Sequence, residues 1–122
     1  MNKKFLTAIF LTVTITNLSF VNAVCNCAFP ASAQYNKMTT ADIYARTAHK
    51  EFRAKNFLKA AQDFEKAYQT YNQSVYLDNA VTSYLSYSSE QLSNKNYDPA
   101  IKYCTKVLAI RANDNNAKEL LS

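Results

Sequence analysis

Apolar residues recur every three or four positions along most of the chain after residue 39, which is the spacing of amphipathic helices. The pattern predicts helices over about 40–54, 57–71 and 75–93, a fourth from Pro99 to about Ile110, and a short fifth over 117–121. No stretch shows the period-two alternation of a strand. The predicted fold class is therefore all-α, with antiparallel helix-turn-helix units stacked as a short α-solenoid.

Two of these segments, residues 56–71 and 96–111, carry the same series of residues. In each, Asn is followed by an aromatic residue, by Ala three positions later, by a larger residue after four more, and by a small or β-branched residue after a further three. The two series are Phe57, Ala60, Phe64 and Ala67, and Tyr97, Ala100, Cys104 and Val107. Offsets of three and four place each series on one stripe of a helix, so the chain contains an internal repeat.

The N-terminus has the composition of a secretory signal peptide. Lys3 and Lys4 precede an uncharged run over residues 5–24, and small residues follow. We expect cleavage after residue 33, where residues 31–33 fit the A-x-A pattern, or alternatively after Ala23. An uncleaved anchor is the other interpretation, because the uncharged run is about long enough to span a bilayer. The expected location is outside the cytoplasm: periplasmic or secreted, or anchored in the membrane.

These features divide the chain into a signal peptide at 1–33, a disordered lead-in at 34–38 and a helical domain at 39–122. Loss of Lys3 and Lys4 lowers the net charge from +5 to +3, because 12 basic and 9 acidic residues remain. The charges are interspersed, so they give no strong case for a nucleic-acid partner. The chain has no Gly, no Trp and one His, so phosphate loops, metal clusters and Ser-His-Asp catalysis lack their residues. We therefore expect that the protein is not an enzyme and that it binds no cofactor.

The role of the cysteines depends on the cleavage site. Cleavage after residue 33 discards Cys25 and Cys27, whereas cleavage after Ala23 retains them. Cys104 lies on the apolar stripe of the fourth helix and reads as core. A retained pair could form a disulfide with itself, with Cys104 or with a partner. The C-x-C spacing fits neither a zinc site nor a C-x-x-C motif, so a thiol redox or metal-delivery role is an alternative that requires the early cut.

The helix pairs resemble the tetratricopeptide repeat, whose 34-residue unit places aromatic and small residues at matching offsets. The first repeat covers about 41–74 and the second about 81–114, with a C-terminal helical stub that would begin a third near Asn115. The residues that carry the resemblance, besides the two series above, are Tyr44 and Ala48 in the first repeat and Tyr84, Tyr87 and Ser88 in the second. The two series are 40 rather than 34 residues apart, and we assign the six extra residues to an added turn at the start of the third helix. An unrelated four-helix bundle is the alternative.

The resemblance implies a groove, lined by the first helix of each pair, that binds a peptide or protein segment. The groove residues that it implies are Asp42, Ala45, His49, Phe52 and Arg53 in the first repeat, and Thr82, Leu85, Ser89 and Ser93 in the second. The family's carboxylate clamp needs Lys and Asn where this chain has Ala45 and His49, so that clamp is not expected. The predicted function is an exported, non-catalytic interaction module. A structural subunit of an envelope assembly is the alternative, and self-association through the open C-terminal end is possible in both.

Overall fold

The computed structural model describes residues 31–122, and this part of the chain is helical apart from short turns. Residues 31–53 form the first helix (the 31–53 helix). It is followed by α2 (Phe57–Thr70), α3 (Ser74–Ser93), α4 (Tyr97–Ile110) and α5 (Asn115–Leu121). No residue between 31 and 122 is in a strand. The predicted all-α fold is confirmed.

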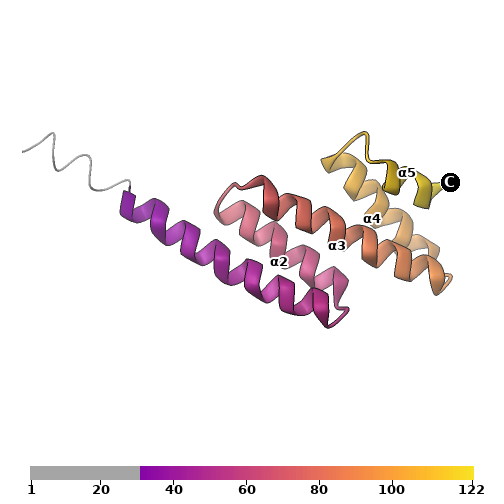
Figure 1. Ribbon diagram of the computed structural model, residues 1–122. Helices are drawn as coiled ribbons and strands as arrows, with labels where there is room; N and C mark the ends of the chain where they lie inside the picture. Colours follow the sequence, from indigo (N-terminus) through magenta and orange to yellow (C-terminus); the bar gives the residue numbers. More distant parts are fainter. Residues whose placement is uncertain (1–30) are drawn as a thin grey trace, which may run out of the picture. The chain divides into compact units, whose positions relative to one another are not determined.

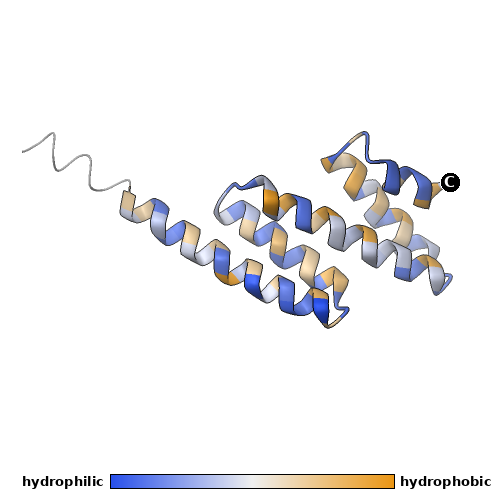
Figure 2. Ribbon diagram, in the orientation of Figure 1, coloured by the Kyte–Doolittle hydropathy of each residue, from blue (hydrophilic) through white to orange (hydrophobic). Residues whose placement is uncertain are grey.

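Residues 37–122 pack as one unit in which each helix contacts the next along the chain. α2 packs on α3, α3 on α4 and α4 on α5, and α5 also touches α3 (Figure 1). Hydrophobic and hydrophilic residues are interspersed along every helix, as amphipathic helices require (Figure 2). Consecutive packing of this kind is solenoid-like. None of the helices in the described part of the chain is both long enough and apolar enough to cross a membrane.

The core lies along the predicted stripes. Ala60, Phe64 and Ala67 on α2 are at most 2% exposed, as are their counterparts Ala100, Cys104 and Val107 on α4. One cluster joins the 31–53 helix to α2 and α3, and a second joins α2, α3, α4 and α5. Tyr97 is the exception, with 58% of its surface exposed. It occupies the first position of α4, and no described helix covers it.

Two turns of the chain are built alike, 40 residues apart. Lys55 and Lys95 have φ of 63° and 62°, the left-handed conformation that commonly ends a helix. The backbone N–H of the next residue, Asn56 or Asn96, bonds to the carbonyl of Glu51 or Gln91 at 2.9 and 2.8 Å. The Asn side chain bonds to the same residue's side chain, at 2.8 and 3.0 Å. The repeat seen in the sequence is therefore also a repeat of backbone geometry.

The structure corrects the predicted disordered lead-in, because residues 34–38 are helical. These residues include Gln34, Lys37 and Met38 and contain neither Gly nor Pro, so nothing in them stops a helix. Thr39 therefore lies inside the 31–53 helix and does not cap it, although Thr39 and Asp42 have the spacing of a capping box.

The structural repeat is 40 residues long. The helices α2 and α4 have 14 residues each and start at positions 57 and 97. The six residues assigned to an added turn are helical, since α3 begins at Ser74 and has 20 residues. These residues are 75–80, and their counterparts 40 positions earlier, 35–40, are helical too. The extra turn thus belongs to both copies, whereas the units predicted at 41–74 and 81–114 place it between them.

Candidate functional site: a groove lined by the first helix of each pair

Side chains of the 31–53 helix, α3 and α5, together with Phe57 and Phe64 of α2, line a series of three hollows, which we call the groove. The first hollow, of about 400 Å³, is lined by Arg46, His49, Phe52 and Arg53. The second, of about 160 Å³, is lined by His49, Phe52, Phe64, Asn79, Thr82 and Ser83. The third, of about 610 Å³, is lined by Phe57, Thr82, Leu85, Ser86, Ser89, Asn116, Glu119 and Leu120. Shared residues connect each hollow to the next.

The first hollow is basic. Arg46, His49 and Arg53 recur at intervals of three and four, so they share one face of the 31–53 helix. All three are exposed. Within residues 31–122 the ion pairs are made by Lys59, Lys66, Lys106 and Arg111, and neither Arg46 nor Arg53 has a carboxylate partner there. Two guanidinium groups are therefore available to an incoming anion.

The second hollow is mainly aromatic on one side. Phe64 forms its floor, since only 2% of this residue is exposed, and the His49 ring packs edge-on against it with centroids 4.9 Å apart. Phe52 is held by Phe57, whose ring lies 5.1 Å away in a T-shaped arrangement. These contacts fix the walls of the hollow before any ligand arrives.

Six of the nine predicted groove residues line these hollows: His49, Phe52, Arg53, Thr82, Leu85 and Ser89. The structure places the other three elsewhere. Ala45 is only 7% exposed and belongs to the first core cluster, to which α3 contributes Tyr76 and Ala80. Asp42 accepts a hydrogen bond from the Tyr76 hydroxyl at 2.7 Å. Ser93 lies at the last position of α3, where its hydroxyl donates to the Ser89 carbonyl.

Sequence reasoning missed Arg46 and Ser86, and also Asn116, Glu119 and Leu120 on α5. The first two follow from the repeat, because Arg46 is one turn before His49, and Ser86 occupies the same position in α3. The residues of α5 were missed because this segment looks too short to cover the end of the stack. It does pack, however: Ala117 is fully buried with Val107, and Asp114 caps the helix by accepting from the Ala117 N–H at 2.9 Å.

The two first helices present different chemistry at equivalent positions. Adding 40 to the three basic positions 46, 49 and 53 gives Ser86, Ser89 and Ser93. The 31–53 helix is therefore basic where α3 carries only hydroxyl groups. The far side of the groove, on α5, adds the carboxylate of Glu119. The groove thus runs from a basic end through an apolar and hydroxyl-lined middle to an acidic residue.

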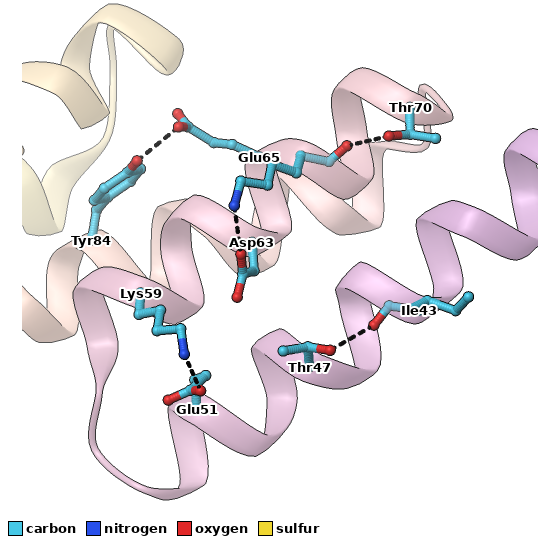
Figure 3. Close-up of polar contacts among 9 residues, drawn as sticks. Ile43, Thr47, Glu51, Lys59, Asp63, Glu65, Thr70 and Tyr84 are labelled. Atoms are coloured by element: carbon cyan, nitrogen blue, oxygen red, sulfur yellow. Dashed lines mark hydrogen bonds and ion pairs between the residues drawn. The ribbon is translucent and has the colours of Figure 1, made fainter.

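A polar cluster ties together the helices that support the groove. The Tyr84 hydroxyl donates to Glu65 at 2.8 Å (Figure 3), and Lys106 donates to both, at 2.9 Å and 2.8 Å. Burial raises the pKa of the Tyr84 phenol to about 12. Burial also lowers the pKa of Lys106, but its hydrogen bonds to Glu65 and Tyr84 outweigh this and leave it raised. At neutral pH the cluster is one ion pair around a neutral phenol, joining α2, α3 and α4.

The cysteines add no site to the described part of the chain. Cys104 is a free, fully buried thiol in the core. Cys25 and Cys27, on which the thiol alternative depends, lie outside the described residues, as does the predicted signal peptide up to residue 30. Among residues 31–122 no cluster of three or more His, Cys, Asp or Glu side chains could hold a metal ion.

Comparison of the chain with models of protein families, with curated proteins and with solved structures finds no match.

Proposed function

We propose that this chain is an exported, non-catalytic interaction module of the tetratricopeptide type, and that its groove holds a peptide or protein segment. The observation that supports the proposal is that the two helix pairs share a scaffold but differ in the residues that they present to the groove. Their turns, the lengths of their second helices and the buried stripes of those helices agree at an offset of 40 residues, while the groove positions of the first helices differ. A scaffold that is repeated, with a surface that is not, is what a binding groove on a stack of repeats requires.

The groove also has the composition of a binding surface. Aromatic rings, aliphatic side chains and hydroxyl groups all line it, and the hydroxyl-bearing residues Thr82 and Ser89 are exposed. Aromatic residues supply large contact area at low entropy cost, and hydroxyls supply adaptable hydrogen bonds. The hydroxyls of Thr82 and Ser83, which line the second hollow together with His49, donate to backbone carbonyls of their own helix. These features favour holding a ligand over transforming it.

The test is a selection from a phage-displayed library of random peptides, with the purified full-length protein as bait. Thr82→Trp fills the groove at the point shared by the second and third hollows. Thr105→Trp is the matched control, since both threonines are exposed and each donates to a carbonyl four residues earlier, at 3.0 and 2.8 Å. We expect the selected peptides to bind the wild type and Thr105→Trp and not to bind Thr82→Trp. Peptides that bind all three proteins equally, or no enrichment at all, would contradict the proposal.

A further inference from the structure

We propose that the segment held in the groove carries one or two carboxylates beside a bulky apolar side chain. This inference rests on the proposed function and names the chemistry of the ligand. The carboxylates lie against Arg46 and Arg53, and the apolar side chain enters the second hollow, over Phe64.

The charges of the first hollow favour a ligand that carries carboxylates. Arg46 and Arg53 are seven residues apart, two turns of helix, and line the same hollow as His49. The nearest acidic residues on this helix are already engaged: Asp42 accepts from Tyr76, and Glu51 accepts from Lys59 and Asn56 (Figure 3 shows the Lys59 contact). Guanidinium groups pair with carboxylates in bidentate geometry, which selects a carboxylate over a neutral side chain.

The second hollow lies beside the basic one. It shares His49 and Phe52 with the basic hollow, so an apolar side chain in one lies next to a carboxylate in the other. Its volume of about 160 Å³ limits it to one large side chain. A buried aromatic or aliphatic anchor beside a charged contact is the arrangement that concentrates binding energy in peptide recognition.

The third hollow limits how far the acidic character of the ligand extends. Glu119 lines it, and the neighbouring lining side chains are neutral: Thr82, Ser86, Ser89 and Asn116. A ligand that is acidic along its whole length would place like charges together at Glu119. We therefore expect carboxylates at one end of the bound segment and neutral or basic residues at the other.

The experiment uses the peptides selected by phage display, resynthesised with a fluorescent label, and measures their affinity by anisotropy. Each peptide is compared with a twin in which Asp and Glu become Asn and Gln, and with a twin in which the apolar residue becomes Ser. The protein variants are Arg46→Glu/Arg53→Glu and the control Lys37→Glu/Lys102→Glu, which makes the same change in net charge at exposed positions outside the hollows. Thermal unfolding of both variants confirms that they remain folded.

We expect acidic and apolar residues to be enriched, with each twin weakened about tenfold and the arginine variant weakened by at least as much, while the lysine control stays within about twofold. Raising the salt concentration should weaken the parent peptide and leave the Asn/Gln twin unchanged. Neutral or basic peptides that bind in the groove and are lost with Thr82→Trp would overturn this inference and leave the proposed function standing. Peptides insensitive to Thr82→Trp would overturn both.

Discussion

The two helix pairs of this chain, residues 31–70 and residues 74–110, have the same backbone plan and different surroundings. Both have a left-handed lysine in the turn and a 14-residue second helix, and both set a lysine over the ring of a tyrosine: Lys66 over Tyr44 at 5.9 Å and Lys106 over Tyr84 at 4.6 Å. The second tyrosine is fully buried in the second core cluster and donates to Glu65 of the first pair, whereas Tyr44 is half-buried. The position of a helix pair in the stack therefore decides, more than its local sequence does, how deeply its tyrosine is buried.

The faces of the second helices show the same effect. Ala61 on α2 is fully buried in the second core cluster, whereas its counterpart on α4, Ile101, is 51% exposed. A small residue suits the packed face because it lets the next helices approach. The exposed isoleucine lies on a face that no described helix covers. Stability should therefore be distributed unevenly between the pairs.

The largest expected effect comes from the central core position of each pair. Phe64→Ala removes a buried ring and should cost about 3–5 kcal/mol, most of the stability of a domain this small, which is roughly 5–10 kcal/mol. Cys104→Ala at the counterpart position removes one sulfur and should cost about 1 kcal/mol. Urea unfolding followed by circular dichroism measures both. Equal losses would contradict the view that the two positions differ in the volume they fill.

A smaller effect is expected at the tyrosine that joins the pairs. Tyr84→Phe removes the hydroxyl shared by Glu65 and Lys106 and should cost about 1 kcal/mol, more than Tyr44→Phe at the half-buried counterpart. The pH dependence gives a sharper test. The phenol ionises near pH 10 when unfolded and at about 12 when folded. The Tyr84 contribution is therefore complete below pH 10 and is lost as the pH rises to 12.

The measurement is the urea midpoint of wild type and of Tyr84→Phe from pH 8 to pH 11.5. The wild type should lose stability faster than the variant above pH 10, so the two curves converge. The raised pKa of Lys106 acts in the same direction. Parallel curves over the whole range would show that the Tyr84 phenol is not selectively kept neutral by the fold.

The smallest effect tests the likeness of the two turns. A non-glycine residue pays for the left-handed conformation, so Lys55→Gly and Lys95→Gly should each stabilise the protein, by about 0.5–1 kcal/mol. Because the two turns have the same hydrogen-bond pattern, the two gains in stability should be equal within about 0.3 kcal/mol. They should add in the double variant. A gain at one turn and a loss at the other would contradict their equivalence.

The helices and their core stripes were predictable from the sequence, because the spacing of apolar residues reports directly which face is buried. The six stripe positions from Ala60 to Val107 are all in the core. The start of the first helix was not predictable in the same way, since Thr39 and Asp42 have capping-box spacing and the residues before them carry no apolar stripe. The helix forms there because the residues permit it. Permissive residues are a weaker signal in the sequence than a residue that ends a helix.

The groove could be predicted in its chemistry but not in its extent. The register of the repeat located His49, Arg53 and Thr82. It also selected Ala45, whose burial depends on how closely α2 and α3 approach the 31–53 helix, and this distance is a property of tertiary packing. The contribution of α5 depends in the same way on a tertiary contact, the burial of Ala117.

The most direct test of the account is an NMR titration of the 15N-labelled full-length protein with a phage-selected acidic peptide. We predict amide shift changes concentrated at residues 46–53, 82–89 and 116–120, with little change around Lys59 and Lys102 on the second helices. In the Arg46→Glu/Arg53→Glu variant these changes should disappear at the same peptide concentration. Shift changes centred on α2 and α4, with the groove undisturbed, would contradict the account.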